Sequence, residues 1–281
     1  MTQNRKTREP PETQDTESIK SHLATLGLFN MLESFDQEMN RLQQGHLSPT
    51  QALHNLLEGE VQRRAERRIE RRIRESKLPE RKTLIQFDFD FQPTLDKSLV
   101  SELFTMRFVA RRQGVVLAGG SGTGKSHLAK ALALEACKHQ YRVRYTTASD
   151  MLRELYASLA DDSFEHQLKV YVRPELLVID EVGFDRLERE DARNAALFFK
   201  VIDGRYEKLS TILTTNIDFE QLGKYLGDPL VTTSIVDRLI HHSTVITING
   251  PSWRHKKSND LNEAVRAKKG AKVAGKRKAR A

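Results

Sequence analysis

A glycine-rich turn between an apolar run and a helical pattern is the strongest constraint on how this chain folds. Residues 115–136, VVLAGGSGTGKSHLAKALALEA, contain the complete pattern GxxxxGK[ST] from Gly119 to Ser126. In such a turn, glycines let backbone N–H groups surround phosphate groups at the start of a helix. The pattern requires a buried strand before it and a helix after it, and this sequence supplies both. It therefore predicts an α/β domain that binds a nucleoside triphosphate.

The turn itself supplies the expected phosphate contacts. Lys125 is expected to reach the outer phosphates, and the Ser126 hydroxyl is expected to bind Mg²⁺. ATP and Mg²⁺ are therefore the expected cofactors. The residues assigned to nucleotide binding in this turn are Gly119, Gly120, Ser121, Gly122, Thr123, Gly124, Lys125 and Ser126.

Two acidic residues end a second apolar run, LLVIDE, at residues 176–181. Asp180 is expected to hold the nucleotide's Mg²⁺ together with Ser126, and Glu181 to orient and deprotonate an attacking water. Paired acids at this point favour hydrolysis over transfer of phosphate to a small acceptor. The alternative for Glu181 is an exposed acid in a turn.

Two later polar residues complete the candidate catalytic set. Asn216 ends the β-branched run STILTTN, where its amide could contact the γ-phosphate or the water, or simply form a turn. Arg238 lies on an amphipathic helical pattern and is a candidate to reach the nucleotide of a neighbouring subunit, with a local pair to Asp237 as the alternative. His241 and His242 have no other metal-type ligand near them in the sequence, so we expect them to be structural.

The rest of the pattern divides the chain into regions. Helical spacing of apolar residues from Ile19 to Leu42, and a Ser48-Pro49 helix start, predict a small helical domain. Further on, helices alternate with apolar strands, which predicts a largely parallel sheet. The alternating phenylalanines of FDFDF predict an extended connector between the two. The expected regions are a disordered N-terminus at 1–16, a helical DNA-binding and oligomerisation domain at 17–78, a linker at 79–97, the ATPase domain at 98–255 and a basic, disordered tail at 256–281.

Basic residues are concentrated in two places. Residues 266–280 carry eight lysines and arginines and no acid, which equals the net charge of +8. Such a tail adds non-specific affinity for polyanions, of which nucleic acid is the commonest. The end of the third predicted helix is rich in arginine, whose planar fork suits phosphate oxygens; the alternative is a solvated helix with Glu–Arg pairs. The DNA-contact candidates on this helix are Arg63, Arg64, Arg67, Arg68, Arg71 and Arg72.

Composition also excludes some classes of protein. No apolar run approaches the roughly 20 residues that span a bilayer, and the first residues are polar. We therefore expect a cytoplasmic protein with no membrane partner. The single cysteine, Cys137, lies in an apolar helical pattern and is expected to be a buried thiol, so no disulfide framework or cysteine metal site can form.

In their order along the chain, these motifs resemble the AAA+ ATPases and, more narrowly, the IstB family of transposition helper ATPases, related to the DnaC helicase loaders. The resemblance covers about residues 17–255, including GTGKSHLA, LLVIDEVGF, RYEKLSTILTTN and IVDRLIHHSTVI. It implies a homo-oligomer with ATP at its subunit interfaces, which assembles on double-stranded DNA and remodels it during DNA transposition and recombination. An IstA-like partner transposase would perform strand transfer, because this chain offers no nuclease or strand-transfer constellation of its own.

The resemblance also implies roles for single residues. The family's helical lid with its sensor 2 arginine is not expected here, because few residues follow the last predicted strand. Two alternatives stay open: a DnaC-like helicase loader, and a small-molecule phosphotransferase that would depend on an acceptor and ignore DNA. The implied roles are nucleotide and metal binding for Lys125 and Ser126, Walker B for Asp180 and Glu181, sensor 1 for Asn216, and the arginine finger for Arg238, with Arg205 as a second subunit-facing candidate.

Overall fold

The computed structural model describes residues 11–183, 192–217 and 229–256. They belong to two compact units, one reaching to Arg71 and one starting at Arg72. Among the described residues, no helix is both long and apolar enough to cross a membrane. Residues 257–281 of the basic tail and the predicted absence of a lid lie outside the described ranges.

Three helices build the first unit around a small apolar core of Leu23, Met31, Phe35 and Leu56. The expectation of disorder up to residue 16 is wrong in part, because the first helix begins at Pro11. Proline suits that position, since the first N–H groups of a helix have no partner within it. The three helices are α1 (Pro11–Thr25), α2 (Phe29–Gln43) and α3 (Pro49–Glu75), whose last residues belong to the second unit.

The start of α3 has the cap that the sequence predicts. Ser48 Oγ accepts a hydrogen bond from the N–H of Gln51 at 3.2 Å, and Gln51 Oε1 accepts one from the N–H of Ser48 at 2.8 Å. This reciprocal pair satisfies two N–H groups that the helix itself leaves unpaired.

A five-stranded sheet forms the centre of the second unit, in the order β2-β3-β4-β1-β5. Every neighbouring pair is parallel, which confirms the predicted α/β fold with a parallel sheet. Because all strands run in one direction, their carboxyl ends meet at a single edge of the sheet. The strands are β1 (Gly114–Gly119), β2 (Val143–Thr147), β3 (Leu176–Val182), β4 (Ser210–Thr215) and β5 (Ser243–Ile248).

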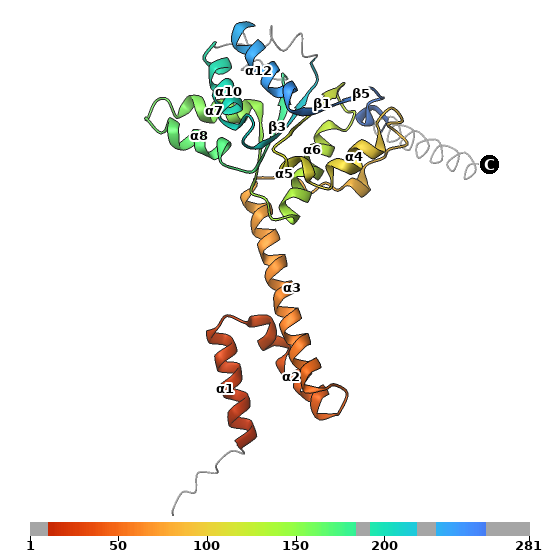
Figure 1. Ribbon diagram of the computed structural model, residues 1–281, viewed down its shortest axis with the longest axis vertical. Helices are drawn as coiled ribbons and strands as arrows, with labels where there is room; N and C mark the ends of the chain where they lie inside the picture. Colours follow the sequence, from red (N-terminus) through yellow and green to blue (C-terminus); the bar gives the residue numbers. More distant parts are fainter. Residues whose placement is uncertain (1–10, 184–191, 218–228, 257–281) are drawn as a thin grey trace, which may run out of the picture. The chain divides into compact units, whose positions relative to one another are not determined.

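Helices cover both faces of this sheet, as Figure 1 shows. Successive strand residues point to opposite faces, so Val116, Leu177 and Leu213 pack against one helical layer. Before β1 the chain forms two short helices rather than one, because Met106 between them adopts a left-handed conformation with φ of 57°. One layer holds α7 (Ala148–Ala157), α8 (Phe164–Val172), α10 (Ala192–Arg205) and α12 (Pro229–His241); the other holds α4 (Lys97–Leu103), α5 (Arg107–Ala110) and α6 (Lys125–Lys138).

Candidate nucleotide-binding site

The glycine-rich loop joins the end of β1 to the start of α6. Gly122 and Gly124 have φ of 79° and 102°, a region that side chains disfavour. A Cβ on Gly122 would lie 2.1 Å from Ser252 Oγ, and one on Gly124 would lie 2.6 Å from the Phe87 ring. Glycine is therefore required here both by the backbone conformation and by segments that pack directly on the loop.

Lys125 lies against this loop with an exposed fraction of 9%. Its Nζ donates hydrogen bonds to the carbonyl oxygens of Gly119 at 2.8 Å and Gly120 at 2.7 Å. Burial lowers the pKa of Lys125 and nearby Arg254 adds to the effect, while the charge on Asp180 opposes it. A cationic group is thus held at the carboxyl edge of the sheet.

Three hydroxyl groups orient the buried carboxylate of Asp180. Ser126 Oγ donates to Oδ1 at 2.8 Å, and Thr214 Oγ1 donates to the same oxygen. The Tyr145 hydroxyl donates to Oδ2. Burial and the charge on Asp180 raise the pKa of Tyr145, so the phenol stays protonated and can donate.

Sequence reasoning missed Tyr145 and Thr214. They belong to β2 and β4, the two strands that flank β3 in the sheet. Parallel neighbours bring their side chains beside the carboxyl end of β3, but the order of the strands cannot be read from local pattern. The only signal was polar residues near the ends of both strands.

A local irregularity in β3 leaves the Glu181 side chain exposed although its neighbours in the strand are buried. The register between β3 and β4 shifts between Ile179 and Val182, and Glu181 has φ of 62°. The Glu181 N–H donates to Thr214 Oγ1 at 2.9 Å, while its side chain is exposed between the buried Asp180 and Val182. Bulges of this kind re-aim side chains.

Glu181 and Asn216 line the same cavity of about 60 Å³ as Lys125 and Ser126. Asn216 directly follows β4 and is exposed. The structure therefore brings together the predicted phosphate-binding loop, the two acids and the strand-end asparagine. Their arrangement can hold a phosphate beside a buried acid and an exposed one.

A second, larger cavity of about 490 Å³ shares Lys125 and Ser126 as lining residues. Its lining also includes Phe87, Phe91 and Trp253, and Phe91 packs edge-on against Trp253 with ring centroids 4.9 Å apart. A cavity of this volume with aromatic walls suits a flat, apolar ligand group such as a nucleobase. The cavity was not predicted from the sequence.

The phenylalanine segment that forms this wall is not the predicted extended connector. It begins with the short 3₁₀ helix η1 (Leu84–Gln86) and continues through turns. Phe87 packs edge-on against His127 at 5.5 Å, and His127 Nε2 donates to the Thr83 carbonyl oxygen at 2.9 Å. Contacts with α6 and the loop thus replace the hydrogen bonds of an extended strand.

The chain after β5 returns to the loop, which the sequence also did not reveal. The Trp253 N–H donates to the Gly122 carbonyl oxygen at 2.9 Å. Arg254, the next residue, lines both cavities. A second cationic side chain therefore stands beside Lys125, although no lid arginine was expected.

The two arginines proposed to face another subunit, Arg205 and Arg238, differ in how far they are buried. Arg205 is 1% exposed, so the prediction that it faces a neighbour is wrong. Its guanidinium donates to Thr211 Oγ1 at 3.0 Å and to the carbonyl oxygens of Tyr171 and Pro174, both at 2.8 Å. It also donates to the Ser210 carbonyl oxygen, so its donors are used within its own chain.

Arg238 is partly exposed and pairs with a different acid from the one considered. Its Nε lies 3.0 Å from Asp203 Oδ1 on α10, rather than beside Asp237. The guanidinium also lies over the rings of Phe199 at 4.9 Å and Tyr206 at 5.7 Å. These exposed contacts are weak enough to be exchanged for others.

Not all of the six arginines proposed for DNA contact have the same setting. Arg64 Nε binds Glu60 Oε1 at 2.8 Å, and Glu60 accepts hydrogen bonds from the N–H groups of Asn30 and Met31 at the start of α2. Burial acts to raise the pKa of Glu60, but the hydrogen bonds from Arg64 and the amides outweigh it and lower that pKa. Arg64 therefore has a structural role in the helical unit. Of the other five, Arg72 is half-buried and four are exposed: Arg63, Arg67, Arg68 and Arg71.

Folding also changes the interpretation of the adjacent histidines. The expectation that His241 and His242 lack a further metal-type ligand is wrong, because the turn after α10 brings Glu207 beside them. The His242 Nε2 lies 2.8 Å from Glu207 Oε1.

A parallel sheet with a glycine-rich phosphate loop after β1 and paired acids at the end of β3 defines a P-loop protein of the AAA+ class. The family model described as IstB-like ATP binding protein matches residues 21–260. The chain belongs to this family, as the sequence resemblance predicted.

Curated relatives and solved structures agree with this assignment. A Bacillus thuringiensis subsp. berliner protein of insertion sequence IS232, described as ATP-binding, is 34% identical over 248 residues, 87% of this chain and 98% of the relative. An insertion sequence IS21 protein of Pseudomonas aeruginosa with the same description is 40% identical over 200 residues, 71% of this chain and 74% of the relative.

Two solved structures share the fold of the second unit. AMPPCP-bound DnaA from Aquifex aeolicus has a TM-score of 0.53 at 25% identity, covering 66% of this chain and 56% of that one. DnaI has a TM-score of 0.50 at 25% identity, covering 61% of this chain and 90% of that one.

Proposed function

We propose that the protein binds ATP with Mg²⁺ and hydrolyses it to ADP and phosphate. The observation that carries this proposal is the cavity in which Lys125, Ser126, Glu181 and Asn216 meet, beside the oriented carboxylate of Asp180. The ATP-binding description of the family and of its insertion-sequence relatives supports the choice of nucleotide.

Each of these residues has a part in the proposed reaction. Glu181 accepts a proton from water while the water oxygen bonds to the γ-phosphorus and the bond to the bridging oxygen of ADP breaks. Asn216 orients this water or the γ-phosphate. Lys125 and Arg254 offset the phosphate charge. Mg²⁺, held by Ser126 and Asp180, would neutralise charge on the outer phosphates.

The insertion-sequence relatives support a role in DNA transposition. We propose that the ATP-bound protein assembles as a homo-oligomer on double-stranded DNA and recruits a partner transposase, since its relatives belong to insertion sequences. In this assembly Arg238 would exchange Asp203 for the nucleotide of the neighbouring subunit. Exposed arginines on α3 would contact phosphates of the DNA.

The first test separates the nucleotide site from the DNA surface. Lys125→Ala should abolish ATP binding and ATP-dependent retention on duplex DNA. A variant with alanine at 63, 67, 68 and 71 keeps Arg64 and its bond to Glu60, so the helical unit stays folded. It should bind DNA more weakly, and its salt slope should be shallower by roughly 0.9 for each DNA phosphate that the variant no longer neutralises.

A matched control is Arg153→Ala, because this exposed arginine pairs with Asp150 and belongs to α7 of the second unit rather than to α3. Its salt slope should equal that of the unchanged protein. An unaltered slope in the four-arginine variant would show that α3 is only a solvated helix with Glu–Arg pairs. ATP-dependent retention that survives Lys125→Ala would refute the proposed role of the nucleotide.

A helicase loader is the second candidate, since the sequence motifs also resemble those of the DnaC helicase loaders. Both candidates use the same nucleotide chemistry, so they differ only in the protein partner. Copurification of the ATP-bound protein with a transposase encoded beside its gene favours the first, whereas copurification with a replicative helicase favours the second.

A further inference from the structure

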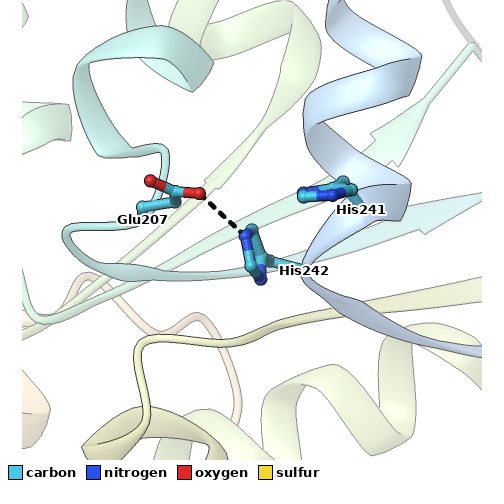
Figure 2. Close-up of side chains that lie close together, drawn as sticks. All are labelled: Glu207, His241 and His242. Carbon is cyan, nitrogen blue, oxygen red and sulfur yellow. Dashed lines mark hydrogen bonds and ion pairs between the residues drawn. The ribbon is translucent and has the colours of Figure 1, made fainter.

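We propose that Glu207, His241 and His242 form a binding site for a divalent transition metal, for which Zn²⁺ is the best match. Figure 2 shows the three side chains directed towards a common space, with Glu207 from the turn after α10, His241 from the last position of α12 and His242 from the residue that follows it. One ligand atom from each lies within 4.8 Å of the others. All three are exposed, so an ion and a water ligand can reach them.

Both halves of the site rest on a rigid framework. The buried fork of Arg205 anchors the turn that carries Glu207, and the N–H groups of residues 208 and 209 both donate to the Arg205 carbonyl oxygen at 3.0 Å. On the other side, the carbonyl oxygen of His242 accepts from the Gly114 N–H at 2.8 Å, which ties it to the start of β1. The backbone at the ligands is therefore already positioned.

The donor set and its spacing suit zinc. Two imidazoles and one carboxylate are a known three-ligand set for Zn²⁺, with water as the fourth ligand. Bonds of about 2.0–2.1 Å place neighbouring ligand atoms of a tetrahedral site about 3.3 Å apart. Glu207 Oε1 and His242 Nε2 are separated by 2.8 Å, and a ligand atom of His241 lies within 4.8 Å of a ligand atom of each. The three ligand atoms are therefore within about 1.5 Å of the tetrahedral spacing.

Tyr206 supplies the outer contact that zinc-binding histidines commonly have. Its hydroxyl lies 3.0 Å from His241 Nδ1, which leaves Nε2 of that ring available for the ion. Such a contact fixes both the tautomer and the ring orientation.

This site is distinct from the nucleotide's Mg²⁺ site in place and in chemistry. His242 lies just before the amino end of β5, whereas the phosphate loop follows the carboxyl end of β1. Because β1 and β5 are parallel, the two sites lie at opposite ends of the strands. Mg²⁺ prefers oxygen ligands, so two imidazoles select against it. A bound ion would join the turn after α10 to the end of α12, beside Arg238 and Tyr206.

The competing explanation is an ordinary exposed histidine–glutamate pair. The chain contains a comparison for it: His54 Nε2 lies 3.1 Å from Glu58 Oε2 on α3, and both are exposed. Within the described residues, that pair has no third ligand group, whereas Glu207, His241 and His242 form a group of three metal-type side chains close enough to share an ion.

The test uses the untagged full-length chain, freed of metal with a chelator and kept in excess Mg²⁺. Calorimetric titration with Zn²⁺ should give one ion per chain, and Co²⁺ should produce a visible absorption band that Zn²⁺ removes. Glu207→Gln keeps a hydrogen bond to His242 but should abolish zinc binding, as should His242→Ala. Tyr206→Phe should weaken binding about 10- to 100-fold.

His54→Ala serves as the control and should bind zinc as the unchanged chain does. Failure of the unchanged chain to bind Zn²⁺ would overturn the proposal. Binding that persists undiminished in Glu207→Gln or His242→Ala would also overturn it, because the ion would then lie elsewhere. ATP hydrolysis is not needed for any of these measurements.

Discussion

Replacing Tyr145 with phenylalanine tests whether orientation of Asp180 matters for catalysis. The substitution removes one hydroxyl that donates to Asp180 Oδ2 and keeps the aromatic ring in the core. Asp180 is only 2% exposed, so water cannot easily replace the lost donor. Ser126 and Thr214 would still bind Oδ1, and the carboxylate could rotate about that remaining anchor.

The expected magnitude follows from the charge and burial of this hydrogen bond. Bonds to charged groups contribute about 1.5–3 kcal/mol, and leaving a buried acceptor unpaired costs a similar amount. We therefore expect Tyr145→Phe to lower the free energy of unfolding by about 2 kcal/mol. If the same energy holds the carboxylate in its metal-binding orientation, ATP turnover at low Mg²⁺ should fall roughly 10- to 100-fold, since 1.36 kcal/mol is tenfold in rate.

Tyr171→Phe provides a matched control. Tyr171 is also buried, and its hydroxyl donates to a carboxylate, that of Glu154, away from the phosphate loop. Tyr171→Phe should lower the free energy of unfolding without lowering the rate of ATP hydrolysis.

The assay measures steady-state ATP hydrolysis as a function of Mg²⁺ concentration, together with urea unfolding of each variant. Tyr145→Phe should shift the Mg²⁺ dependence to higher concentration, and excess Mg²⁺ should restore part of the rate. If Tyr145→Phe and Tyr171→Phe lose equal stability and both keep the normal Mg²⁺ dependence, Tyr145 is only a structural residue and the reasoning is refuted.

Three further predictions concern single groups. Glu181→Gln should slow hydrolysis by roughly 10²- to 10⁴-fold and prolong the ATP-dependent complex with DNA, measured by filter retention; faster dissociation would count against its role as base. Burial raises the pKa of Cys137 to about 11, so iodoacetamide at pH 8 should label it only when urea unfolds the chain, and rapid labelling of folded protein would contradict its burial. Burial lowers the pKa of His127 below its ordinary value of 6.5 in the folded chain. As the pH falls below about 6.5, the unfolded chain therefore binds this proton more readily than the folded chain, and the free energy of unfolding decreases. Chemical denaturation from pH 5 to 8 should show a smaller acid loss in His127→Gln, and an equal loss would exclude His127 as the cause.

Much of the fold could be predicted because its signals are local. The Ser48 cap, the glycine-rich turn and the apolar strands each depend on residues a few positions apart. Such patterns reflect hydrogen bonding and side-chain periodicity within one element. The parallel direction of the strands followed as well, since helices alternate with them and parallel strands require crossovers. Lys125, Ser126, Asp180 and Glu181 could be placed at one edge for the same reason.

The sequence by itself thus determined the class of the second unit and the chemistry at the ends of its strands. Only the tertiary structure decided which side chains meet across elements. Strand order brings Tyr145 and Thr214 to Asp180. Partners from α8 and β4 surround the buried Arg205, which the local pattern left as a surface residue. The meeting of Glu207 with His242 also depends on helix packing. Contacts of this kind arise from long-range burial of apolar surface, which is not encoded at any fixed spacing along the chain.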